Sequence, residues 1–224
     1  MFQFKQFAVA DELCAMKVGT DGVLLGAWAD VEGDRRILDL GTGSGLIALM
    51  LAQRNAEAEI VALDIDRDAT LQASANFSLS PWGERMSAVN SNITEYASKR
   101  KFTHIVTNPP YFVDSLHSPN AARTAARHTS SLPFSDIVAA AERLLERGGR
   151  LSVILPSDVA ALFRREAFER LWLSRQLDIV TKPGEEPRRT MMEFVLCSEP
   201  RMPRCSTMLM GTEEAKRLTQ DFYL

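Results

Sequence analysis

Residues 39–45 read DLGTGSG and join two apolar runs, at 37–40 and 46–52. Gly41, Gly43 and Gly45 let the backbone turn sharply and leave no Cβ between the main chain and a ligand. A short buried strand, a glycine turn and a helix form the start of a βαβ unit, which binds its ligand at the carboxyl end of the strand. The segment therefore predicts an α/β fold with a ligand site at this turn. A tight turn without a ligand is the alternative.

The rest of the chain repeats this alternation of short apolar runs and helical patterns, which is typical of a parallel sheet built from βαβ units. Gly148 and Gly149 are expected to end the third helix, and Ser157 or Asp158 to cap the fourth. The long hairpin between the last two strands suits an antiparallel finish on an otherwise parallel sheet. We expect strands at 37–40, 59–63, 87–89, 103–107, 151–155, 177–181 and 191–197, and helices at 46–52, 68–79, 132–147 and 157–170.

The composition fits one globular domain without a membrane anchor. A chain of 224 residues that is 46% hydrophobic and 25% charged can bury one large core. No apolar run approaches the roughly 20 residues that cross a bilayer, and residues 1–10 lack the order of a signal peptide, so we expect a cytoplasmic protein. The formal net charge of −3 argues against binding nucleic acid through overall charge. The cysteines and histidines lack metal-site spacing, so no metal is expected: Cys14, Cys197, Cys205, His104, His117 and His128.

The glycine turn resembles motif one of the class I S-adenosylmethionine methyltransferases. Leu46 stands where a dinucleotide-binding fingerprint has its third glycine, and Asp39 opens the pattern instead. The resemblance implies that this loop wraps the amino acid and ribose parts of the cofactor. Asp64 follows the second strand, 23 residues after Gly41, at the interval where an acid reaches ribose hydroxyls. Asp66 is either its partner or a helix cap, and Asn92 either contacts the adenine ring or is an ordinary turn residue.

Residues 108–111 read NPPY and directly follow the fourth predicted strand. Pro109 and Pro110 donate no backbone hydrogen bond, so the carbonyls of Asn108 and Pro109 can accept from a ligand, as can the Asn108 amide oxygen. Two acceptors can hold both hydrogens of a planar amino group while the ring of Tyr111 stacks on the heterocycle. The motif resembles motif four of methyltransferases that modify amino nitrogens of adenine, guanine or glutamine. A simple proline turn is the alternative.

Six segments, two of which contain the motifs described above, extend this likeness over essentially the whole chain. They resemble the bacterial family of tRNA(Val)-specific adenine-N6 methyltransferases, which modify the adenine immediately 3′ of the anticodon. The segments are FKQF (4–7), CAMKVGTDGVLLGAW (14–28), LDLGTGSGLIALMLAQ (38–53), NPPYF (108–112), AARHT (125–129) and DFYL (221–224).

The resemblance implies a Rossmann-like class I methyltransferase fold. The expected sheet is mostly parallel and seven-stranded with an antiparallel last strand, and helices cover both faces. One domain spans 1–224: residues 1–35 cover the cofactor and can touch substrate, and 36–224 form the catalytic core. Thr20 and Asp21 are the expected contacts to the methionine end of S-adenosylmethionine, with a glycine-rich turn before a helix as the alternative.

Basic residues gather in sequence around the NPPY motif. Residues 99–131 contain five lysines and arginines against one acid. Such a cationic segment is expected to bind phosphates around a flipped-out base, unless it is merely a solvated loop. Arg188 and Arg189 can extend it. The predicted RNA-binding residues are Lys99, Arg100, Lys101, Arg123 and Arg127.

These observations predict methylation of the N6 amino group of a tRNA adenine. Three alternatives stay open: methylation of guanine N2 in ribosomal RNA or of a protein glutamine, a non-catalytic cofactor- or RNA-binding module, and, least favoured, an NAD oxidoreductase. A tRNA is the expected partner, with no DNA, membrane or obligatory protein partner.

Overall fold

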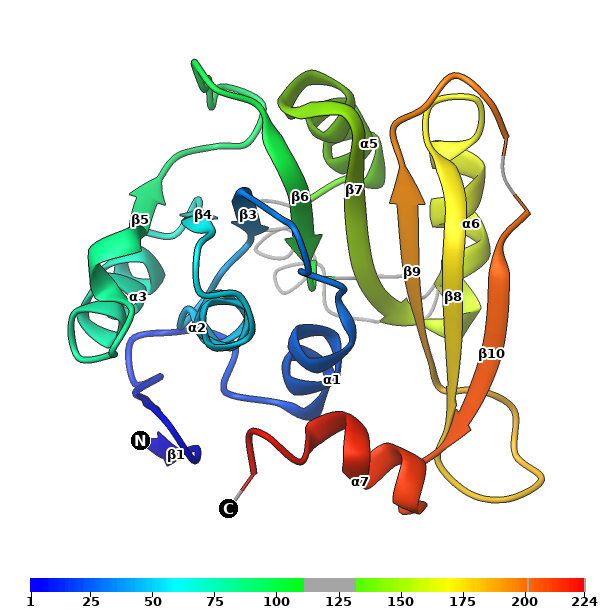
Figure 1. Ribbon diagram of the computed structural model, residues 1–224, viewed down its shortest axis with the longest axis horizontal. Helices are drawn as coiled ribbons and strands as arrows, with labels where there is room; N and C mark the ends of the chain where they lie inside the picture. The colour runs from blue at the N-terminus through cyan, green and yellow to red at the C-terminus, as the bar shows by residue number, and fades with distance from the viewer. Residues whose placement is uncertain (111–131, 201, 224) are drawn as a thin grey trace, which may run out of the picture.

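An eight-stranded sheet runs through the middle of the molecule in the order β10-β8-β9-β7-β6-β3-β4-β5 (Figure 1). The computed structural model describes residues 1–110, 132–200 and 202–223. Every neighbouring pair of strands is parallel except the two that involve β9. The strands are β3 (Arg36–Leu40), β4 (Glu59–Asp64), β5 (Met86–Asn90), β6 (Phe102–Thr107), β7 (Leu145–Pro156), β8 (Trp172–Val180), β9 (Arg189–Val195) and β10 (Arg204–Leu209).

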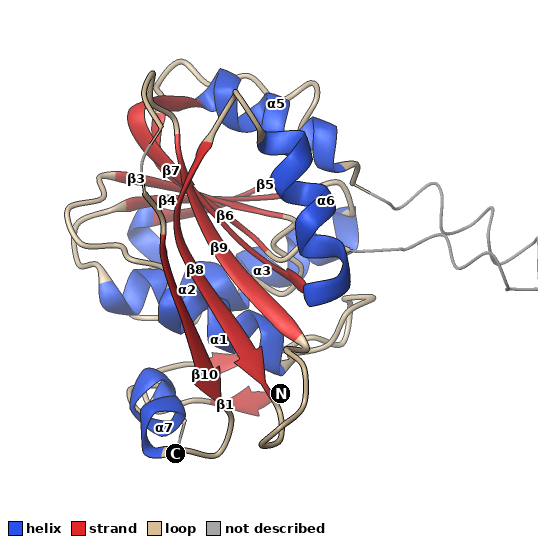
Figure 2. Cartoon of the chain, turned by 90° about the vertical axis from the view of Figure 1, so that its right-hand side faces the viewer, coloured by secondary structure: helices blue, strands red, loops and turns tan. Residues whose placement is uncertain are grey.

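Helices cover both faces of this sheet (Figure 2). The sheet separates the core into two hydrophobic clusters, one on each face. The central strands β3 and β6 are buried along their full length, as expected where a parallel sheet is covered on both sides. One cluster joins the sheet to α1 (Thr20–Trp28), α2 (Leu46–Arg54), α3 (Arg67–Ser78) and α7 (Glu213–Thr219). The other joins it to α5 (Phe134–Leu144) and α6 (Ser157–Ala167).

The amino-terminal residues pack against the first of these clusters. A short hairpin of β1 (Phe2–Gln3) and β2 (Ala8–Val9) leads into it. Phe4, Phe7 and Val9 are buried there. Elsewhere in the chain, a 3-10 helix, η1 (Gly83–Arg85), precedes β5. No helix in the described ranges has the length and hydropathy needed to cross a membrane.

The predicted α/β class and all seven predicted strands are confirmed. The sheet has one strand more than expected, because β10 pairs in parallel with the outer side of β8. β9 lies inside the sheet because it pairs with both β7 and β8. The predicted end of the third helix at Gly148 and Gly149 is wrong, because α5 ends at Leu144 and the chain enters β7 at once. The Gly148 N–H donates to the Leu196 carbonyl at 2.8 Å, and the Leu196 N–H donates to the Gly149 carbonyl at 2.9 Å. These bonds hold both glycines in the sheet.

The predicted cap of the fourth helix is also wrong. The residue before α6 is Pro156, and no side chain accepts a hydrogen bond from the first turn. The Ser157 hydroxyl instead pairs with the Thr190 hydroxyl at 3.0 Å, which ties the start of α6 to β9. Since β3, β4, β5, β6 and β7 run in one direction, the loops that follow them meet at one edge of the sheet.

Candidate functional site

The glycine loop leaves β3 at this edge and turns into α2. Gly41, Gly43 and Gly45 have φ angles of +72°, +55° and +82°, a region that side-chain-bearing residues rarely adopt. The backbone N–H groups of Gly41 and Thr42 donate to the Leu63 carbonyl at 2.8 and 3.1 Å. A Cβ added to Gly41 or Gly43 would meet nothing within 4 Å, so space lies open beside the loop.

Asp39 lies buried beneath this loop. Its Oδ2 accepts from the Thr42 hydroxyl at 2.6 Å and from the Ala48 N–H at 3.1 Å. Its Oδ1 is also buried, and no atom in the described part of the chain bonds to it. Burial raises the pKa of Asp39 to about 7, although the bonds from Thr42 and Ala48 oppose the rise. Asp39 therefore orders the loop through two hydrogen bonds and keeps one oxygen to which none of the described residues donates.

Asp64 ends β4 and faces the same loop. Its Oδ2 accepts from the Gly43 N–H at 2.8 Å and its Oδ1 from the Asp66 N–H at 2.9 Å. Burial raises the pKa of Asp64, opposed by these backbone bonds. Each carboxylate oxygen keeps a second lone pair for a ligand hydroxyl. Asp66 caps α3 by accepting from the Asp68 N–H at 2.9 Å, which matches the cap alternative for this residue.

Two further residues frame this carboxylate that the sequence analysis did not single out. Ile65 directly follows Asp64 and is 63% exposed, which is high for a large aliphatic side chain beside a loop. Asn90, at the end of β5, donates to the carbonyls of Asp64 (3.1 Å) and Ile65 (2.9 Å) and fixes the turn that carries them. The sequence offered only one signal for Ile65, an aliphatic residue directly after Asp64.

Asn92 follows β5 and has the geometry of a turn residue. Its Oδ1 accepts from both the N–H and the hydroxyl of Thr94, each at 3.0 Å. This closes the local turn and matches the turn alternative. Contact between Asn92 and an adenine ring stays a prediction.

Asn108, Pro109 and Pro110 follow β6, and Tyr111 lies outside the described residues. The Asn108 Oδ1 is buried, and the described chain offers it no hydrogen-bond donor. The Thr107 hydroxyl donates to the Leu40 carbonyl at 2.8 Å, which holds the ends of β6 and β3 together. Two buried acceptors, on Asp39 and Asn108, thus come from neighbouring strands at one edge, and neither has a donor among residues 1–110, 132–200 and 202–223. A ligand that carries N–H or O–H donors fits this arrangement.

Thr20 and Asp21 form the first turn of α1. Thr20 is exposed and Asp21 is half-buried. The Asp21 carboxylate binds the Arg189 guanidinium, with Oδ2 and Nε 2.7 Å apart. Because Arg189 begins β9 opposite Pro156, this ion pair spans from α1 to the carboxyl end of β7.

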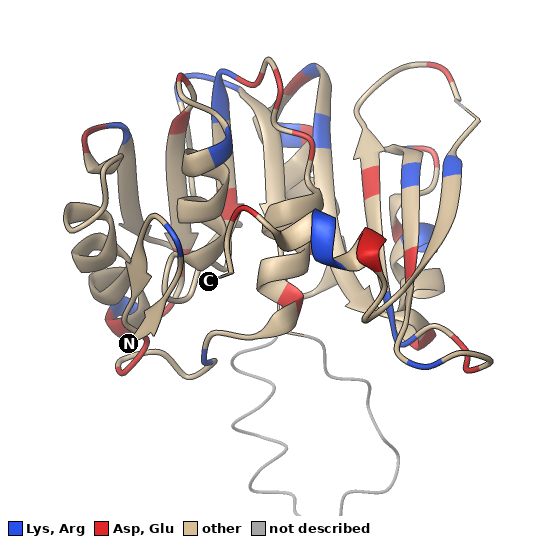
Figure 3. Cartoon of the chain, turned by 60° about the horizontal axis from the view of Figure 1, so that its bottom comes forward, with Lys and Arg blue, Asp and Glu red and all other residues tan. Residues whose placement is uncertain are grey.

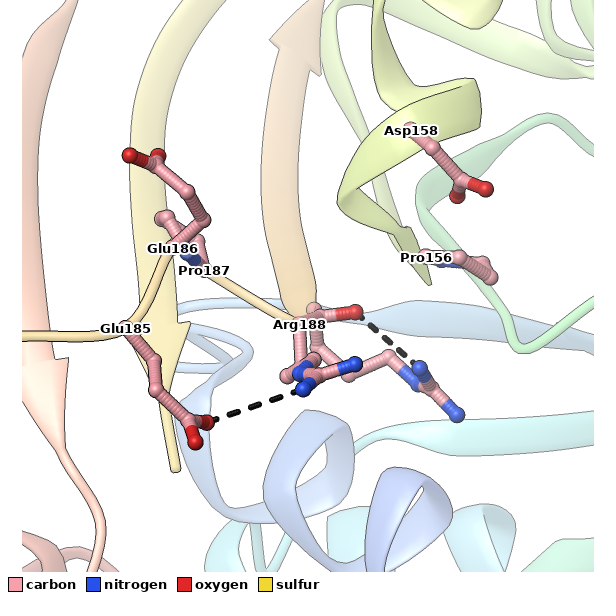
Figure 4. Close-up of a pocket in the computed structure, with 7 residues that line it drawn as sticks. Pro156, Asp158, Glu185, Glu186, Pro187 and Arg188 are labelled. Carbon is pink, nitrogen blue, oxygen red and sulfur yellow. Dashed lines mark hydrogen bonds and ion pairs between the residues drawn. The ribbon is translucent and has the colours of Figure 1, made fainter. Parts of the chain in front are cut away.

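A hollow of about 470 Å³ opens next to this ion pair (Figure 4). It lies farther along the same edge, since Pro156 is three residues beyond Val153, the β7 partner of Thr107. Within it Arg188 approaches Glu185 at 3.7 Å. Both charge signs line the hollow, so it has no purely cationic wall. Its lining residues are Pro156, Asp158, Glu185, Glu186, Pro187, Arg188 and Arg189.

The structure places Lys99, Arg100 and Lys101 away from Asn108, so they do not surround it as expected, and their binding to RNA stays a prediction. These residues precede β6, whose six residues place them about 20 Å from Asn108, at the opposite edge of the sheet. There Arg100 pairs with Glu59 at 2.7 Å and Lys101 binds the Arg143 carbonyl. Basic and acidic positions are both scattered over the elements drawn in Figure 3. The other two predicted residues, Arg123 and Arg127, lie outside the described residues.

Comparisons with known proteins identify the family of this chain and its fold. The family model described as "Methyltransferase small domain" matches residues 19–172. A Bacteroides thetaiotaomicron protein named tRNA1(Val) (adenine(37)-N6)-methyltransferase is 47% identical, over 100% of this chain and 97% of its own length.

Two solved structures share the fold at low sequence identity. One is an Agrobacterium tumefaciens protein described as a predicted O-methyltransferase, with a TM-score of 0.68 and 21% identity over 90% of this chain and 96% of that one. The other is an N-methyltransferase from Bradyrhizobium japonicum in complex with S-adenosyl-L-homocysteine, with a TM-score of 0.56 and 14% identity over 79% of this chain and 85% of that one.

Proposed function

Because the chain belongs to the tRNA1(Val) (adenine(37)-N6)-methyltransferase family, we propose that it methylates the N6 amino group of adenine 37 in that tRNA. S-adenosylmethionine supplies the electrophilic methyl group when it is bound. The observation that carries the proposal is the buried Asn108 Oδ1 at the end of β6, an acceptor to which no residue of the described chain donates. An exocyclic amine brings the N–H donors that this acceptor lacks.

The glycine loop and the acids around it are the proposed cofactor site. Gly41 and Gly43 leave open space for the ligand beside the backbone, and Asp64 offers lone pairs to the two ribose hydroxyls. The Oδ1 of Asp39, which has no donor in the part of the chain that the structure describes, can accept from the amino end of the cofactor directly or through water. We assign Thr20, Asp21 and residues 1–35 to the cover of this site, and Asn92 to the adenine end.

Asn108 and the Pro109 carbonyl are the proposed clamp on the substrate amine. The lone pair of an exocyclic amine is delocalised into its heterocycle, which makes the nitrogen a weak nucleophile. Two acceptors placed around a pyramidal nitrogen bind the transition state better than the planar ground state, and this difference accelerates the reaction. The surplus proton leaves after methyl transfer, so the clamp needs no histidine beside it. Tyr111 is assigned to stacking on the adenine.

A clamp variant tests this assignment. Asn108→Ala is expected to retain S-adenosylmethionine affinity and to lose about 100-fold or more in kcat, the scale found for removing one group that stabilises developing charge. Isothermal titration measures the affinity, and methyl transfer to a tRNA1(Val) transcript measures turnover. A transcript with guanine at position 37 is the matched substrate control. Full turnover in Asn108→Ala would contradict the clamp.

The product identifies the substrate class. Nucleoside mass spectrometry after methylation of total RNA is expected to give N6-methyladenosine confined to tRNA. Appearance of N2-methylguanosine would instead support the ribosomal RNA alternative. Methylated glutamine in a peptide digest of cell protein treated in the same way would support the protein alternative. An inert protein that still binds the cofactor would support a non-catalytic module.

A further inference from the structure

One buried amide on α3 joins two segments that are distant in sequence. Asn76 is 2% exposed. Its Nδ2 donates to the carbonyls of Ser44 and Ala10, both at 2.8 Å, and its Oδ1 accepts from the Ala10 N–H at 3.1 Å. Ser44 belongs to the glycine loop, between Gly43 and Gly45. A single side chain therefore fixes the backbone of the proposed cofactor loop relative to the amino-terminal segment.

Residues 10–19, here called the strap, run from this amide to the start of α1. Gln72 lies one turn before Asn76 on α3, and its Oε1 accepts from the Leu13 N–H at 3.3 Å. Farther along, the Asp11 Oδ2 accepts from the Val18 N–H at 2.9 Å. The strap is thus held on the surface of α3, and it leads to Thr20 at the start of α1.

The strap also lies close to the acid assigned to the ribose. Cys14, in the middle of the strap, is buried, and its pKa is raised to about 11, chiefly by burial and next by the charge of Asp64. On the other side of Asn76, its neighbour Phe77 packs directly against Gly45. One turn of α3 therefore supports the glycine loop and the strap together.

We propose that Asn76 is a positioning residue that couples the strap to the cofactor loop, so that filling the loop with S-adenosylmethionine also orders the strap. The proposal rests on the cofactor site of the proposed function. An amide suits this role because it donates two hydrogen bonds and accepts a third, and all three are made to backbone atoms whose positions do not depend on rotamers. Because these partners are main-chain atoms, any displacement of Ser44 changes the geometry at Ala10 through one rigid planar group.

Hydrogen exchange followed by mass spectrometry tests the coupling without any tRNA. In the wild-type protein, S-adenosylmethionine is expected to slow amide exchange in residues 41–48 and also in the strap. In Asn76→Ala the strap is expected to exchange at least about fivefold faster, as the loss of hydrogen bonds implies. The cofactor should then protect residues 41–48 while changing strap exchange by less than about twofold, since the link is gone.

Two matched variants on the same helix separate coupling from general loosening. Gln72→Ala removes a strap contact but leaves the Ser44 bond, so its strap is expected to exchange faster and still respond to the cofactor. Ser74→Ala, at an exposed position of α3, is expected to match the wild type. The proposal also predicts a higher Kd for S-adenosylmethionine in Asn76→Ala, by about fivefold or more, with kcat at saturating cofactor little changed.

The proposal would be overturned if S-adenosylmethionine still slowed amide exchange of the strap in Asn76→Ala. It would also be overturned if the cofactor left the exchange of the wild-type strap unchanged. If Asn76→Ala does not fold, as judged by circular dichroism, Asn76→Ser gives the same test, because its shorter hydroxyl cannot reach both carbonyls. A wild-type protein that shows coupled protection but methylates no tRNA adenine would refute the proposed function and leave the role of Asn76 supported.

Discussion

Gly45 meets two separate structural requirements, and Gly45→Ala perturbs both. Its φ of +82° costs a side-chain-bearing residue about 1–2 kcal/mol. An added Cβ would also lie 2.5 Å from the Phe77 ring and 3.3 Å from the Ala73 Cβ, and such overpacking costs about 1–3 kcal/mol. Gly45→Ala is therefore expected to lower the free energy of unfolding by about 2–5 kcal/mol.

Gly41→Ala is the matched control from the same loop. Its φ is +72°, but a Cβ there would meet nothing within 4 Å, so only the conformational cost of about 1–2 kcal/mol is expected. Urea unfolding followed by circular dichroism measures both variants. Phe77→Leu removes the ring that the Cβ would strike. In a double-mutant cycle, Gly45→Ala should therefore cost about 1–2 kcal/mol less in the Phe77→Leu background than in the wild type. Equal losses for the two glycines, or no coupling to Phe77, would refute the packing argument.

Three further predictions concern buried charge. Because the folded-state pKa of Asp39 is raised to about 7, its contribution to stability falls as pH rises from about 4 to 7. The thermal midpoint of Asp39→Asn should therefore rise relative to that of the wild type as pH increases over that range. A difference between the two midpoints that does not change with pH would contradict this. Asp34 is buried, but its hydrogen bond to His104 (2.8 Å) and nearby charges outweigh burial and lower its pKa. Asp34→Asn should destabilise by about 1–3 kcal/mol at pH 7, and urea titrations should show the difference shrinking as pH falls below about 4. Arg175 pairs with the buried Glu193 at 3.0 Å, so Arg175→Met should cost about 3–5 kcal/mol in urea unfolding, whereas Arg175→Met/Glu193→Gln should recover part of it.

The centre of the sheet and its ligand loop could be predicted because local and tertiary preferences agree there. β3 and β6 are short strands buried along their full length, and the glycines at 41, 43 and 45 do adopt left-handed backbone angles. The family resemblance is confirmed as well. β10 could not be found in the same way, because four of its six residues are exposed and it is defined by pairing with β8.

The errors arose where distance along the chain was taken for distance in space. Lys99 and Asn108 are close in sequence, but a whole strand separates them. Gly148 carries the left-handed angle expected at a helix end, with a φ of +81°, yet it uses that angle inside β7. Pairing of this region with β6 and Leu196 decides its structure, and such non-local bonds leave no local sequence pattern.

The position of β9 between β7 and β8 has a consequence for how the chain assembles. β7 is made long before β9, so its outer edge stays without a hydrogen-bonding partner until residues 189–195 have left the ribosome. β8 and β10 can join the sheet only through β9. The last quarter of the chain therefore supplies the strands that cover the open edge of β7. Shorter nascent chains present an unpaired strand edge, which promotes aggregation.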